Sequence, residues 1–142
     1  MIVAGLDVGK TRIGIAICDV SDGAIHPIMT IVRRPRSLPD DLAALRRELI
    51  PRAVERIVVG LPLNMDGSEG PAARRMRGFA THLQQALELP VELCDERLTS
   101  FEARERLREI EAGPARRRRA FDSLAAMLIL ENWLEAYRRA AR

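Results

Sequence analysis

The sequence contains few aromatic residues and few cysteines. One tryptophan, one tyrosine and three phenylalanines occur in 142 residues, too few for the rows of aromatic rings on which single-stranded nucleic acids stack. The two cysteines, Cys18 and Cys94, lie in apolar stretches without the spacing of a metal site. We therefore expect both thiols to be reduced and buried, and neither to be catalytic.

Long apolar runs are also missing. A membrane-spanning helix needs about 20 apolar residues, and the first residues lack the basic start and apolar centre of a secretion signal. We therefore expect a cytoplasmic protein without a membrane partner. A chain of this length can bury roughly 68–70% of its unfolded surface in one core, so we expect residues 1–142 to form a single domain.

Lysine is nearly absent, because Lys10 is the only lysine among 23 basic residues. A GC-rich genome would by itself produce such a bias toward arginine. The arginines are nevertheless grouped, at 33–36, 74–77 and 116–119. Grouped guanidinium ions favour phosphate backbones, since each can pair with two phosphate oxygens. The clusters predict a nucleic acid held mainly by its backbone.

An acidic residue ends the first apolar stretch. Residues 2–6 and 13–18 are apolar runs separated by a turn at Gly9, which predicts a β-hairpin. An ionised carboxylate at Asp7 would be partly desolvated, which costs several kcal/mol unless a cation or hydrogen-bond donors offset it. Asp7 is therefore a candidate site residue. The alternative is an aspartate that caps its own turn.

The rest of the chain alternates strand and helix patterns. We predict strands over 24–32, 56–61 and 91–94, and helices over 38–53, 71–87, 100–110 and from 122 onward. Three antiparallel strands followed by two parallel ones, flanked by helices, form the α/β arrangement of ribonuclease-H-like proteins, with a five-stranded mixed sheet.

Polar residues follow two of these strands. Asn64 and Asp66 lie on the loop 62–71, where ligands of open α/β sheets bind and where a helix N-terminus favours phosphate. An ordinary polar connection is equally consistent with this loop. Asp95 and Glu96 end the strand at 91–94. Of these two acids, Glu96 is the stronger candidate and Asp95 is better explained as part of a charged turn.

The last helix begins with a charge. Asp122 heads an apolar helical stripe, either as a site residue or as a first-turn charge. The arginines just before it oppose the helix dipole by roughly 0.3–1 kcal/mol each. We therefore predict that 115–119 is an exposed loop that becomes ordered on a phosphate backbone.

Four segments carry a family resemblance. GLDVGKTRIGIAICD, IVVGLPLNMDGSEGP, DERLTSFEA and FDSLAAMLIL resemble, in order and spacing, the signatures of the YqgF/RuvX family. Its members are described as candidate Holliday junction resolvases and as candidate nucleases that mature the 5′ end of pre-16S rRNA. The resemblance covers nearly the whole chain. It implies that Asp7, Glu96 and Asp122 form the metal-binding acidic triad of a ribonuclease-H-like nuclease.

This chain departs from many ribonuclease-H-like enzymes at one position. They place the second carboxylate at the end of the fourth strand, where this chain has Gly60 and Leu61, so Glu96 has to substitute. Three gathered carboxylates would repel one another by about 4 kcal/mol per pair at 4 Å. Mg²⁺ or Mn²⁺ would remove that cost and activate water. The expected substrate-binding residues are Lys10, Asn64, Arg97, Arg116, Arg117, Arg118 and Arg119.

We predict a metal-dependent nuclease that acts on structured RNA, foremost pre-16S rRNA. The first alternative is a resolvase of branched DNA, which would need a two-fold homodimer to make paired cuts. The second is a non-catalytic nucleic-acid-binding module that acts on ribosomal precursor particles. A nucleotide-dependent ATPase is disfavoured, because such enzymes need two large lobes and 142 residues make only one.

Overall fold

The computed structural model describes residues 1–33, 37–96 and 114–141, and within the last range the side chains from residue 123 onward. Its five-stranded sheet has the order β3-β2-β1-β4-β5. β1 pairs antiparallel with β2, and β2 with β3, whereas β4 runs parallel to both β1 and β5. The predicted mixed sheet is confirmed. Its strands are β1 (Ile2–Val8), β2 (Arg12–Asp19), β3 (Ile25–Val32), β4 (Arg56–Leu61) and β5 (Val91–Asp95).

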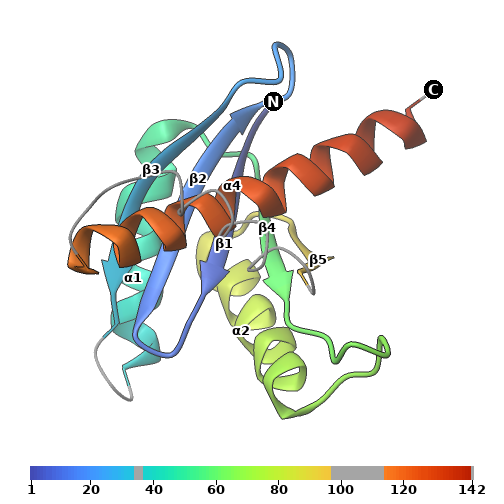
Figure 1. The fold of residues 1–142 in the computed structure, drawn as a ribbon. Helices are drawn as coiled ribbons and strands as arrows, with labels where there is room; N and C mark the ends of the chain where they lie inside the picture. Colours follow the sequence, from blue (N-terminus) through green and yellow to red (C-terminus); the bar gives the residue numbers. More distant parts are fainter. Residues whose placement is uncertain (34–36, 97–113, 142) are drawn as a thin grey trace.

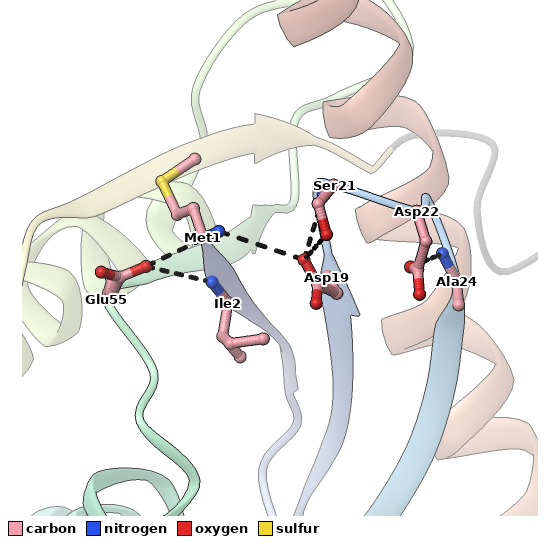
Figure 2. Close-up of polar contacts among 7 residues, drawn as sticks. All are labelled: Met1, Ile2, Asp19, Ser21, Asp22, Ala24 and Glu55. Atoms are coloured by element: carbon pink, nitrogen blue, oxygen red, sulfur yellow. Dashed lines mark hydrogen bonds and ion pairs between the residues drawn. The ribbon is translucent and has the colours of Figure 1, made fainter.

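Polar contacts fix the edge of the sheet at which β1 begins (Figure 2). The Met1 ammonium lies 4.0 Å from Asp19 Oδ1 and 3.9 Å from Glu55 Oε2, and the Ile2 N–H donates to Glu55. Asp19 also accepts hydrogen bonds from the backbone and hydroxyl of Ser21. These bonds tie the hairpin to the segment before β4, so that β1 and β4 start in register.

Helices cover both faces of the sheet (Figure 1). On one face lie α1 (Leu38–Leu49), extended by the 3₁₀ turn η1 (Ile50–Arg52), and α2 (Pro71–Leu87). Both helices have proline in the first turn. Proline suits this position because it lacks a backbone N–H, and the N–H groups of the first turn have no partner within the helix. These helices agree with the predicted ranges. The predicted helix at 100–110 lies outside the described residues.

The helix α4 (Pro114–Ala140) crosses the other face (Figure 1). It begins eight residues before Asp122, so the prediction of a loop at 115–119 was wrong. Pro114 suits the first helical position, and alanine and arginine are both good helix formers. Their propensity outweighs the unfavourable interaction of the arginines with the helix dipole. No helix in the described ranges is long and apolar enough to cross a membrane.

The alternation of side chains along β1 divides the core in two. Ala4 and Leu6 face α1 and α2, whereas Val3 belongs to the cluster under α4. Gly5 also faces α4, because a Cβ there would lie 2.5 Å from Leu130 Cγ. Successive strand residues point to opposite faces, so Asp7 shares the α4 face with Val3 and Gly5.

The two cysteines are free thiols. Cys18 is buried under α4, as predicted, whereas Cys94 on β5 is only partly buried. Burial raises the pKa of both thiols, and the charges of Asp95 and Glu96 add to the effect at Cys94. A raised pKa disfavours the reactive thiolate.

Candidate active site

The carboxyl ends of three parallel strands meet at one edge of the sheet. Leu6 on β1 pairs with Val59 on β4, which brings the next residues, Asp7 and Gly60, to the same level. Gly60 in turn pairs with Cys94 on β5. The two strands that end in candidate acids, β1 and β5, therefore flank β4 on its two sides.

Glu96 reaches across β4 toward Asp7. Its N–H donates to the Leu61 carbonyl at 3.2 Å, which continues the β5 ladder by one residue. A Cβ added to Gly60 would lie within 2.8 Å of Glu96 Cδ and 2.7 Å of Ile129 Cδ1. The Glu96 carboxylate therefore occupies the space above Gly60, on the same sheet face as Asp7.

The two acids interact electrostatically. Burial, and to a smaller extent the negative charges of Asp7 and then Asp95, together raise the pKa of Glu96 to about 7. Asp7 is itself partly buried at the end of β1, and Asp95 is exposed. Half-buried carboxylates that repel each other are typical of functional sites, because a bound cation or a shared proton stabilises them.

The third predicted acid, Asp122, belongs to α4, and its side chain is outside the described set. Its backbone lies about one helical turn before Ala126. The Ala126 carbonyl lies against Gly5, and Arg138 lies against the turn between β2 and β3, next to the start of β1. The turn of α4 before Ala126 is therefore directed toward the Asp7 end. Among the described side chains, no three histidine, cysteine or acidic groups gather as a metal site.

The predicted substrate-binding residues lie in different places. Lys10 is exposed in the turn after β1 and lines a groove that also includes Glu96. Asn64 donates to Ser68 Oγ at 2.9 Å, and Asp66 accepts from the Ser68 hydroxyl and N–H. Both residues thus organise their own loop. Arg97 lies outside the described residues, as do the side chains of 116–119.

Sequence reasoning missed a polar clamp beneath the turn that carries Lys10. Arg33 donates through Nε to Asp41 Oδ2 at 2.9 Å and through Nη1 to the Gly9 carbonyl at 2.6 Å. Its N–H donates to the Thr11 carbonyl at 2.8 Å. Asp41 is only 4% exposed. The clamp fixes the turn of the hairpin against α1.

No sequence pattern pointed to this pair. Arg33 belongs to an arginine cluster, which suggested phosphate binding. Asp41 lies in the first turn of α1, where acids are common because they complement the helix dipole. Only the burial of Asp41 beneath the end of β3 reveals the pairing.

Comparison with known proteins agrees with this geometry. A family model described as "RuvX: Holliday junction resolvase" matches residues 1–136. A protein of Synechococcus sp. named "Putative pre-16S rRNA nuclease" is 46% identical over 138 residues, which are 97% of this chain and 91% of that protein. One of the same name from Anaeromyxobacter dehalogenans is 48% identical over 131 residues, 92% and 94% of the two chains.

The fold has relatives of known structure. Thermus thermophilus RuvC superposes with a TM-score of 0.61 at 17% identity, over 98% of this chain and 97% of RuvC. This likeness establishes the ribonuclease-H-like fold that the order of strands predicted. With a family match that spans nearly the whole sequence, the chain belongs to the RuvX family.

Proposed function

We propose that this protein is a nuclease that hydrolyses phosphodiester bonds in structured RNA, with precursors of 16S rRNA as its substrate. The observation that carries this proposal is the pair formed by Asp7 and Glu96. The pair lies at the carboxyl edge of the sheet, where open α/β proteins bind ligands. The names of relatives that are 46% and 48% identical over more than nine-tenths of this chain support the choice of RNA.

The acid pair fits a hard divalent cation. Carboxylate oxygens are the ligands that Mg²⁺ and Mn²⁺ prefer, and the raised pKa of Glu96 indicates a site that a positive charge would stabilise. Asp7 and Glu96 would hold the ion, and we propose Asp122 as the third ligand. When bound, a divalent cation activates water and stabilises charge on the phosphate.

The remaining chemistry falls to charged groups of the chain. Lys10, exposed beside Glu96 in the groove, would attract the substrate phosphate and stabilise negative charge that develops on it. The clamp of Arg33 and Asp41 holds the turn on which Lys10 lies, so the backbone of this turn needs little reordering when substrate binds. Arg97 and the arginines at 116–119 remain proposed contacts to the RNA backbone.

A Holliday junction resolvase is the second candidate. The description of the family supports it. The same acids would perform the cleavage, but the protein would have to form a two-fold dimer to cut opposite strands in pairs. The RNA proposal instead places the protein in the cytoplasm, with ribosomal precursor particles as partners.

A cleavage panel tests the proposal. Purified protein is incubated with Mg²⁺ or Mn²⁺ and, separately, a pre-16S leader RNA, a single-stranded RNA and a four-way DNA junction, each with an EDTA control. We expect metal-dependent cleavage of the leader RNA that Asp7→Asn abolishes without loss of RNA binding. Paired cuts in the junction alone would favour the resolvase. Binding without metal-dependent cleavage of any substrate would favour the non-catalytic module.

A further inference from the structure

A groove of about 290 Å³ lies between the turn after β1 and the start of α2. It lies on the α2 side of the sheet edge, and Glu96 is part of its lining, so the groove reaches one member of the acid pair. Its volume is at the lower limit of the roughly 300–1,000 Å³ typical of small-molecule sites. The residues that give it its chemistry are Lys10, Arg33, Arg75, Met76, Phe79 and Glu96.

Two cations of this groove have no anionic partner within the described part of the chain. The neighbouring arginines of α2 differ: Arg77 holds both oxygens of Glu69, at 2.5 and 2.9 Å, and Arg74 donates to the Glu69 carbonyl. Lys10 and Arg75 are exposed, and no ion pair joins either of them to a described acid. Two cations on one groove that no described acid neutralises favour an anionic ligand.

The floor of the groove is apolar and fixed. Phe79 is 7% exposed and Met76 is partly buried, and both pack on the α2 side of the core. The Arg33 guanidinium lies 5.7 Å from the centre of the Phe79 ring, and its bonds to Asp41 and the Gly9 carbonyl hold it there. A rigid apolar surface between positive charges suits a sugar or base whose phosphate lies at the rim.

We propose that this nucleotide groove binds one nucleotide of the substrate strand next to the bond that is cut. Its phosphate lies between Lys10 and Arg75, and its sugar and base lie on Met76 and Phe79. Cleavage beside Glu96 then leaves one new end of the strand in the groove. This inference rests on the proposed nuclease function and adds which part of the RNA the protein holds.

Binding without cleavage tests the groove. In EDTA, a fluorescein-labelled single-stranded RNA decamer is titrated at several salt concentrations. Arg75→Ala removes one cation, so we expect its Kd to rise about five- to ten-fold and the salt slope to fall by about 0.7, the value for one phosphate on a single strand. Arg47→Ala removes an exposed arginine of α1 outside the groove and should change Kd less than about two-fold.

A blocking variant tests the apolar floor. Ala72 is exposed at the groove wall, so Ala72→Trp fills the groove from the surface, whereas Gln85→Trp adds the same side chain on an exposed position of α2 outside it. We expect Ala72→Trp to lose RNA binding at unchanged Tm, and Gln85→Trp to bind normally. Titration of the wild type with uridine 5′-monophosphate should shift the amide resonances of Lys10, Arg75 and Met76.

Three results would overturn the groove: equal effects of Arg75→Ala and Arg47→Ala, normal RNA binding by Ala72→Trp, or resonance shifts confined to other surfaces. If Ala72→Trp does not fold, the comparison of Arg75→Ala with Arg47→Ala and the resonance shifts still test the groove. The two proposals fail separately. RNA bound in the groove but never cleaved with Mg²⁺ or Mn²⁺ refutes the nuclease alone, whereas cleavage with normal binding by Ala72→Trp and Arg75→Ala refutes the groove alone.

Discussion

The carboxylate of Glu96 lies above Gly60, in the space that a side chain on Gly60 would need. The glycine of β4 and the acid after β5 are therefore a matched pair. The end of β4 carries no carboxylate, and Glu96, which follows β5, places its carboxylate over β4 instead. This explains how a chain with Gly60 and Leu61 at that strand end still presents two acids on one face.

Replacement of Gly60 by alanine should displace Glu96. The new Cβ would lie within 2.8 Å of Glu96 Cδ and 2.7 Å of Ile129 Cδ1, and such overpacking costs about 1–3 kcal/mol. We expect cleavage to fall at least about ten-fold, because the displaced acid no longer faces Asp7. Denaturant unfolding and the leader-RNA assay measure the two effects.

Gly78 provides the matched control. A Cβ there would meet no atom within 4 Å, so Gly78→Ala should stabilise α2 by up to about 1 kcal/mol, since glycine is a poor helix former, and cleave normally. If Gly60→Ala cleaves as fast as Gly78→Ala, the Glu96 carboxylate is not needed where the structure has it.

Glu96 should make the metal-free protein less stable as the pH rises. Its folded-state pKa of about 7 lies above the ordinary value of 4.5, so the folded protein binds the proton more tightly than the unfolded chain. Stability should therefore fall between pH 4.5 and pH 7 and stay low above it. The full loss is about 3 kcal/mol, since a ten-fold difference in proton affinity is worth about 1.4 kcal/mol.

Urea unfolding in EDTA at pH 5 and pH 8 measures this loss. Glu96→Gln keeps the shape but cannot ionise, so the variant should lose less stability over this range, whereas Glu135→Gln, an exposed change on α4, should behave as the wild type. Mn²⁺ should stabilise the wild type at pH 8 more than it stabilises Glu96→Gln. Identical pH profiles for wild type and Glu96→Gln would contradict the burial and repulsion described above.

The clamp of Arg33 and Asp41 should show strong coupling. Arg33→Met leaves the carboxylate of Asp41, 4% exposed, without the guanidinium that lies 2.9 Å away. Loss of one partner of a buried ion pair is costly, and we expect about 2–4 kcal/mol. In the double variant with Asp41→Asn, the loss should be clearly smaller than the sum of the two single losses. Additive losses in denaturant unfolding would show that the pair does not act as a unit.

The approach of α4 to β1 should depend on Gly5. A Cβ there would lie 2.5 Å from Leu130 Cγ and 3.0 Å from the Ala126 carbonyl. Gly5→Ala should therefore destabilise the fold by about 1–3 kcal/mol and reduce cleavage, because α4 carries Asp122. Leu130→Ala alone opens a cavity, but added to Gly5→Ala it should cost less than it does in the wild type. Independent effects in unfolding experiments would argue against this contact.

Local patterns predicted most of the fold. Apolar runs, turn glycines and helical spacing predicted the strands and the described helices α1 and α2, because each element buries a face that its own sequence encodes. The same patterns singled out Asp7 and Glu96, since acids at the ends of apolar strands are costly without a purpose. That both lie on one sheet face followed only from the register of β1, β4 and β5.

Other features depend on contacts that no local pattern contains. The start of α4 was predicted eight residues late, because the electrostatic cost of four arginines was weighed above their helix propensity. The role of Arg75 depends on its neighbours Arg74 and Arg77 being bound to Glu69, which the spacing of a basic cluster does not reveal. Predicted contacts of Arg97 and 116–119 remain predictions.

The two sheet faces have different neighbours, and this has an evolutionary consequence. Asp7 and the Glu96 carboxylate belong to the side covered by α4, whereas the nucleotide groove is built largely from α2 on the opposite side. In the proposed nuclease, substitutions along the exposed start of α2 would therefore change which strand is bound, while Asp7 keeps its surroundings under α4. Diversification of substrate preference in such a scaffold requires no redesign of its chemistry.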